Sequence, residues 1–168
     1  MGDIVRVQDM LFSGTSCLFK IGTSISGASP WTGIVDISWE HSREPKVVYA
    51  NRQDGRPIGW TAGKYEVGSF MMKMLLDSSN ALKKMLSDQY GGYGRTPFYL
   101  FGSFYEPELT AEGVMSIVAS PCRIKSVKFS KSEGSDELCE ELSIACLGII
   151  ENGYTLYEAN PALVPQVV

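Results

Sequence analysis

Alternation of apolar and polar residues is the feature that most constrains how this chain can fold. Val35, Ile37 and Trp39 alternate with polar neighbours, and the segment 67–76 repeats the same period of two. Successive side chains of a β-strand point to opposite faces, so this period is typical of strands with one buried face. We therefore predict one strand that begins at Gly33 and a second over 67–76.

Further strands are predicted where β-branched or aromatic residues cluster between turn-forming residues. They span 17–21, 47–49, 98–105, 123–130 and 137–150. Because Ile124 is out of phase with Val127, a β-bulge is expected near Lys125. The dipeptide Asn152-Gly153 between two apolar segments predicts a tight hairpin turn of type I′.

One helix is predicted after the strand over 67–76. Asp77–Ser79 offers side chains that can cap a helix N-terminus, apolar residues recur at helical spacing over 81–86, and Gly91-Gly92 ends the pattern. With 168 residues, the chain fits a single domain over 1–168. The fold class is mainly β: a β-sandwich or small barrel with one flanking α-helix and an extended arm.

Charge and hydropathy exclude several classes of function. Fifteen Lys and Arg against nineteen Asp and Glu give a formal net charge of −4, which argues against a nucleic-acid binder driven by counterion release and against a polybasic membrane surface. No segment approaches the ~18 consecutive apolar residues of a membrane-spanning helix. The first residues lack the apolar centre of a signal peptide. We expect a protein made in the cytoplasm, with no membrane anchor.

Residues that carry chemistry are few. His41 is the single histidine and is expected at the solvated end of its strand, where it has no partner for general base catalysis. Cys17, Cys122, Cys139 and Cys146 contain no Cys-x-x-Cys pair, so we expect no structural zinc. Cys139 and Cys146 lie too far apart along one strand to bond to each other. Free thiols are expected, and an inter-subunit disulfide stays an open alternative.

Carboxylates and glycines give no stronger sign of catalysis. Glu137, Glu140 and Glu141 flank a turn and are expected to be solvated, as are Glu106 and Glu108 beside a proline. The glycine-rich loop over 91–96 lacks the lysine of a phosphate-binding loop. The three tryptophans are assigned to core and interface packing. We therefore expect no catalytic residue, no metal and no cofactor, and hence no enzyme.

An arm is expected at about 41–63, where charged residues flank a brief β-branched segment. Residues 49–66 read Tyr-Ala-Asn-Arg-Gln-Asp-Gly-Arg-Pro-Ile-Gly-Trp-Thr-Ala-Gly-Lys-Tyr-Glu. This segment resembles bacteriophage tail tube proteins, in which an arm ending in Gly-Arg-Pro-x-Gly runs through a Gly-x-Tyr-Glu step into a long strand and then a helix. Residues 121–127, 133–136 and 151–153 are similar to the later strand, loop and final hairpin of that family.

The resemblance implies a structural virion protein whose hexameric rings stack into the hollow tail tube through which DNA passes. The implied partners are further copies of the chain, the tail sheath, tape measure, baseplate and tail terminator proteins, and double-stranded DNA as non-specific cargo. Arginines of the arm are expected to pair with carboxylates of a neighbouring subunit, and a tryptophan to anchor the contact. The subunit-interface candidates are Arg43, Arg52, Arg56, Trp60, Lys64 and Tyr65.

Two other functions fit the same residues. A needle-tube protein of a type VI secretion system, or of a related contractile injection system, would share the fold and the rings but carry effector proteins. A monomeric β-barrel would bind a small ligand if the aromatic residues of 98–105 lined a cavity.

Overall fold

The computed structural model describes residues 4–7, 10–13, 17–49, 57–61, 63–105, 114–130 and 138–156. The strands of the first half are β1 (Ile4–Val7), β2 (Met10–Ser13), β3 (Cys17–Gly22), β4 (Ser29–Trp31), β5 (Ile34–Glu44), β6 (Val47–Tyr49), β7 (Pro57–Trp60) and β8 (Lys64–Leu75). They are followed by α1 (Leu76–Tyr90), β9 (Phe98–Tyr105), β10 (Val114–Ser130), β11 (Cys139–Cys146), β12 (Ile149–Glu151) and β13 (Tyr154–Thr155).

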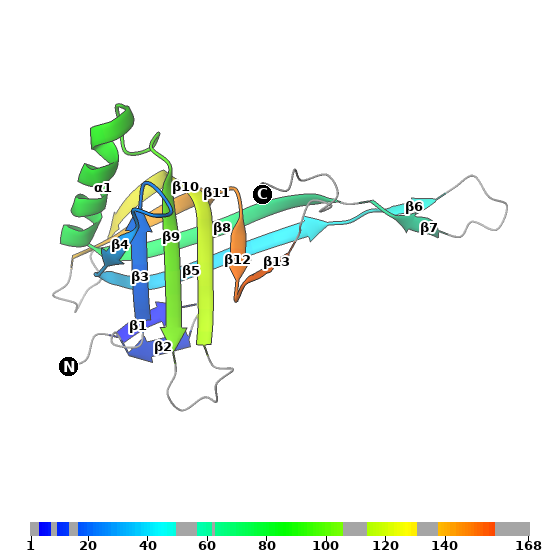
Figure 1. Cartoon of the computed structure of the whole chain (residues 1–168), viewed down its shortest axis with the longest axis horizontal. Helices are drawn as coiled ribbons and strands as arrows, with labels where there is room; N and C mark the ends of the chain where they lie inside the picture. Colours follow the sequence, from blue (N-terminus) through cyan, green and yellow to red (C-terminus); the bar gives the residue numbers. More distant parts are fainter. Residues whose placement is uncertain are drawn as a thin grey trace.

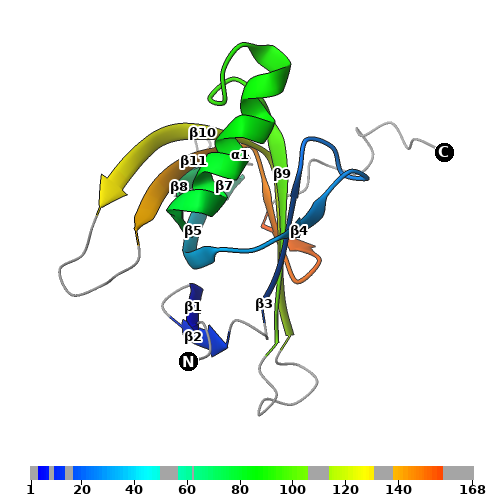
Figure 2. The same cartoon turned by 90° about the vertical axis from the view of Figure 1, so that its left-hand side faces the viewer.

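The main sheet is open and folds into two layers that cross one another (Figures 1 and 2). One layer contains β12, the first part of β10, β9, β3 and β4, and the other contains β2, β1, β5, β8, β11 and the second part of β10. Strand β10 joins the layers, because residues 114–119 pair with β9 and β12 whereas residues 122–130 pair with β11. Of the two predicted forms, the structure therefore has a layered open sheet rather than a closed barrel.

A hydrogen-bonded corner marks the place where the chain passes between the layers. The Ser120 amide donates to the carbonyl of Gly148 at 3.1 Å, and the Leu147 amide donates to the carbonyl of Pro121 at 3.2 Å. The predicted strand 137–150 is interrupted here and becomes β11 and β12. The predicted strand 123–130 is in turn only the second part of β10.

The core lies between the layers, with α1 adding Leu82 and Leu86 at one side (Figure 2). Its large side chains include Phe19, Ile21, Ile37, Trp39, Phe70, Met72, Met74, Phe98, Leu100, Phe104, Ile117 and Leu142. Phe98 and Phe104 are completely buried. They pack within the core, which removes the reason for placing a ligand cavity at 98–105.

Alternation in β5 and β8 is confirmed, with one local correction. Ile37 and Trp39 are buried as predicted, but Ile34 is buried in place of Val35, which is only half-buried. A register shift between Ile34 and Asp36 moves the buried side chain by one residue, since successive residues face opposite sides. The bulge expected near Lys125 is also present, as a register shift between residues 124 and 126.

The helix ends as predicted and begins differently. Gly91 caps its C-terminus with a left-handed φ of 73°. Leu75 is the N-cap residue and makes no side-chain capping bond, so the capping role predicted for Asp77–Ser79 is wrong. Instead the Ser78 hydroxyl donates to the carbonyl of Thr32, because tertiary packing offers an acceptor outside the helix.

Glu140 is buried, so its predicted exposure to solvent is wrong. The carboxylate accepts hydrogen bonds from Ser79 at 2.5 Å and from the Lys83 ammonium group, both on α1. Burial acts to raise the pKa of Glu140, but the bonds from Lys83 and Ser79 and the charge of Lys83 outweigh it and lower that pKa. These contacts fix α1 against β11.

The hairpin between β12 and β13 is confirmed. Asn152 and Gly153 have φ values of 52° and 80°, as a type I′ turn requires. Strands β1, β2 and β4 were not predicted, because they have only three or four residues each and are too short to show a clear period of two. Within the described part of the chain, α1 is neither long nor apolar enough to cross a membrane.

Candidate functional site

A two-stranded arm projects from the layered body (Figure 1). Strands β5 and β8 pair as far as Glu44 opposite Lys64, and β6 and β7 continue the hairpin with Val47 opposite Trp60. Between these pairs, the Thr61 amide donates to the carbonyl of Lys46 at 2.8 Å. The arm expected from the sequence is thus present as paired strands, and residues 50–56 lie outside the described residues.

Gly63 holds the base of the arm closed. Its φ is +72°, and a Cβ atom at this position would lie 2.6 Å from the carbonyl oxygen of Glu44. Only glycine adopts such a φ without cost while letting the two backbones approach so closely. Gly59, in the outer part of the same hairpin, has no atom within 4 Å of an added Cβ.

The arm carries large apolar side chains in solvent. Trp60 is 72% exposed and Tyr49 is 64% exposed, and Val48 is exposed beside them. An isolated two-stranded hairpin is only marginally stable in water, and clustered aromatic side chains on a surface are typical of protein–protein contacts. The geometry therefore suits an arm that is stabilised when its exposed side chains pack against another protein surface.

A polar cluster joins β5 and β8 to the layer that contains β12, at the place where the arm leaves the body. The Ile149 amide donates to the Tyr65 hydroxyl at 3.1 Å, and that hydroxyl lies 3.1 Å from His41 Nδ1. On the other side of the imidazole, Nε2 lies 3.4 Å from the Glu151 carboxylate, which also accepts a bond from the Trp39 indole. A Tyr65 hydroxyl that donates to Nδ1 leaves the imidazole proton on Nε2, facing Glu151.

His41 is therefore not the solvated residue that the sequence predicted. Its side chain is only 15% exposed, because β12 crosses over β5 and brings Glu151 against it. The contacts around it join residues far apart in the sequence: Ile149 is 84 positions from Tyr65, and Glu151 is 112 positions from Trp39. No local pattern signals such contacts.

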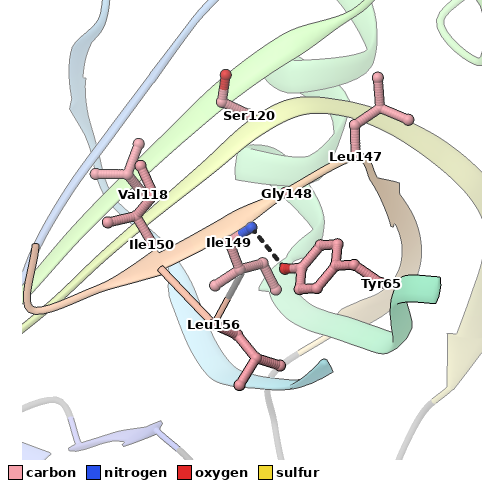
Figure 3. Close-up of a pocket in the computed structure, with 8 residues that line it drawn as sticks. All are labelled: Tyr65, Val118, Ser120, Leu147, Gly148, Ile149, Ile150 and Leu156. Carbon is pink, nitrogen blue, oxygen red and sulfur yellow. Dashed lines mark hydrogen bonds between the residues drawn. The ribbon is translucent and has the colours of Figure 1, made fainter. Parts of the chain in front are cut away.

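An open pocket of about 300 Å³ lies beside Tyr65 (Figure 3). It is lined by Tyr65, Val118, Ser120, Leu147, Gly148, Ile149, Ile150 and Leu156. Tyr65 and Ser120 are the only polar side chains in this lining, and the Tyr65 hydroxyl is already bonded to His41 and to the Ile149 amide. The lining therefore suits apolar contact and offers no nucleophile activated for catalysis.

Several residues of this lining are exposed apolar side chains. Leu147 is 76% exposed, and Ile150 and Leu156 are also exposed; Tyr154, on the adjoining strand β13, is 78% exposed. We refer to these four residues as the β12 patch. Sequence reasoning missed it, although apolar residues on both sides of an Asn-Gly turn at the end of a short hairpin were a visible signal.

The sequence-derived interface candidates fall into three groups. Trp60 is exposed on the arm, and Lys64 is exposed and paired with Glu66. Arg43 lies opposite Tyr65 across β5 and β8 at the base of the arm, where Tyr65 is half-buried. Arg52 and Arg56 lie outside the described residues. Among the residues that the structure describes, no three His, Cys, Asp or Glu side chains are grouped as metal ligands.

Comparison with solved structures gives matches that cover most of the chain. A chain of the anti-feeding prophage baseplate, solved with six-fold symmetry, matches with a TM-score of 0.54 and 12% identity, covering 82% of this chain and 92% of its own length. The SPP1 tail tube protein matches with a TM-score of 0.53 and 12% identity, over 86% and 80% of the two chains. Hcp1 from Flavobacterium johnsoniae matches with a TM-score of 0.51 and 15% identity, over 84% and 99%.

Sequence comparison gives no match to a protein-family model or to a curated protein. At 12–15% identity the structural matches establish a common fold. The chain therefore has the fold shared by phage tail tube and Hcp proteins.

Proposed function

We propose that this chain is a structural virion protein, the subunit of a phage tail tube that stacks as hexameric rings and conducts DNA into the host. The observation that carries the proposal is the projecting arm, with Trp60 72% exposed, on a fold that matches the SPP1 tail tube protein over 86% of this chain. The proposed role is mechanical, with no catalysis and no cofactor.

Ring formation needs two different surfaces on each subunit. A head-to-tail interface joins one surface of a copy to another surface of the next, and it closes into a ring or continues as a filament. The arm, with Tyr49 and Trp60, supplies one exposed apolar surface, and the β12 patch supplies a second. We propose that the arm of one subunit packs on the β12 patch of a neighbouring copy.

Free strand edges support the same proposal. Strands β2 and β4 end the path of the main sheet, each paired on one side. Unpaired edges are sites where another chain can add a strand. Pro30 in β4 lacks an amide donor at one of these edges, which makes β2 the better edge for a neighbouring subunit.

The charge of the chain suits a conduit for a polyanion. The net charge of −4 per subunit gives no overall positive field to hold phosphates. The exposed cations of β10 include Lys128, which lies opposite Glu141 across the β10–β11 pair. We propose that DNA passes as non-specific cargo, and that the sheath, tape measure, baseplate and tail terminator proteins contact the assembled tube in the virion tail.

Sedimentation and electron microscopy of the purified chain test the proposal. Hexamers, stacked rings or tubes with a central channel are expected, with the assembled fraction rising with protein concentration. A chain that stays monomeric across concentration and ionic strength, with no rings in micrographs, contradicts it.

A needle-tube protein of a type VI secretion or related contractile injection system is the second candidate. The similarity to Hcp1 from Flavobacterium johnsoniae favours it as much as the tail tube similarity favours the first. Both candidates form rings, so the cargo distinguishes them. Capsid and terminase genes beside the coding sequence would support the tail tube, whereas effector genes without capsid genes would support the needle tube.

A further inference from the structure

Two cysteines face one another at the corner that joins the layers. Cys122 of β10 lies directly opposite Cys146 of β11 in the register of the antiparallel pair. The bond from the Leu147 amide to the Pro121 carbonyl, one residue beyond each cysteine, identifies them as a non-hydrogen-bonded pair. Both thiols are free, and the interaction with Cys146 raises the pKa of Cys122.

Pairs of this type hold side chains at the separation that a disulfide requires. Cα atoms in a non-hydrogen-bonded antiparallel pair lie roughly 4.5 Å apart, within the range of about 4.4–6.8 Å found for disulfides. Side chains of directly opposite residues lie on the same face of the pair, so the two thiols are neighbours on one side of the sheet. Closing the bond therefore requires a change of side-chain rotamer rather than movement of a strand.

We propose that Cys122 and Cys146 form a redox-sensitive site, which closes to an intrachain disulfide in the presence of a small-molecule disulfide such as oxidised glutathione and locks the corner between the layers. The proposal concerns the single subunit and is independent of tube formation.

The reaction begins at the accessible cysteine. Cys146 is half-buried whereas Cys122 is completely buried, so the Cys146 thiolate attacks the oxidant, forming a mixed disulfide and releasing one glutathione thiolate. The Cys122 thiolate then attacks the Cys146 sulfur and releases the second glutathione thiolate. Two cysteine thiols lose their protons and are oxidised, and one glutathione disulfide is reduced to two thiols.

Reactivity of the pair is restrained in the resting protein. The interaction with Cys146 and burial both raise the pKa of Cys122, which keeps the thiolate scarce. Formation of the mixed disulfide removes that interaction and frees Cys122 to attack. Slow closure over hours at mildly alkaline pH is the expected kinetic behaviour.

The experiment treats the reduced full-length chain with oxidised glutathione, blocks free thiols with iodoacetamide and maps the peptides without reduction. Trypsin cuts after Arg123 and separates Cys122 from the other half of the pair, and cleavage after Glu140 and Glu141 separates Cys139 from Cys146. We expect a peptide that links Cys122 to Cys146. Closing a loop of about 25 residues should raise the melting temperature by roughly 5–10 °C, reversibly on reduction.

Matched variants separate this pair from the other thiols. Cys146→Ser should abolish the link and the rise in melting temperature, and Cys122→Ser provides a second test if the first variant folds poorly. Cys17→Ser should change neither the link nor the melting temperature, since Cys17 of β3 lies opposite Phe104 of β9. Links to Cys17 or Cys139, covalent dimers, a persistent glutathione adduct, or a link that leaves the melting temperature unchanged would each overturn the proposal.

Discussion

Replacing Trp60 with Ala tests whether the arm is an assembly surface. A tryptophan side chain that is 72% exposed leaves about 180 Å² to be covered by a partner, worth up to about 4.5 kcal/mol at ~25 cal/mol per Å². Ordering costs at an interface reduce this gain, so we expect a loss of about 2–4 kcal/mol for each contact. Assembly should then need at least roughly 30-fold more protein.

The assay measures the assembled fraction against protein concentration by sedimentation velocity, with micrographs at each end of the series. The isolated Trp60→Ala subunit should keep its stability within about 0.5 kcal/mol, because an exposed side chain contributes little to the core. Trp60→Phe, which keeps most of the apolar area, should assemble nearly as well as the unmodified chain. An unchanged assembly concentration for Trp60→Ala would refute the reasoning, and so would a large loss of subunit stability.

Three further predictions follow from the described contacts. Gly63→Ala should impair assembly and lower the melting temperature, because its Cβ meets the Glu44 carbonyl, whereas Gly59→Ala in the same hairpin should do neither; equal effects in both variants would exclude a special role for the arm base. Because the pKa of Glu140 is lowered in the folded state, its contribution is present above about pH 4.5 and lost as the pH falls below it, so Glu140→Gln should flatten the acid side of a melting-temperature profile; an unchanged profile would contradict this. In a mobility-shift titration at low salt, duplex DNA should bind weakly or not at all, and micromolar or tighter binding with a steep salt dependence would overturn the passive conduit.

Local features of the sequence determined many of the elements and several of their boundaries. The period of two places Ile37 and Trp39 in the core, because strand geometry alone fixes which side chains share a face. Gly91 ends the helix, since only a residue that tolerates a left-handed φ serves as that cap. The turn at Asn152-Gly153 follows from the same backbone requirement.

Contacts between distant residues were decided only by the tertiary structure. Glu140 reads as one of several surface carboxylates, yet α1 places Lys83 on it from 57 positions away. His41 reads as a strand end, yet β12 covers it with Glu151. Which strands pair depends on the passage of β10 between the layers. The alternation of apolar and polar residues along a strand contains no information about which other strand lies beside it.

The candidate site shows the same division. Charged residues and turn residues indicated an arm with Trp60 as an interface candidate, and Trp60 is exposed on it. The Cys122–Cys146 pair emerged only when β10 and β11 were brought together at the corner. The sequence by itself thus determined the longer alternating strands, the end of the helix and the final hairpin turn, whereas the structure decided what each strand face meets, since packing between layers is a non-local property.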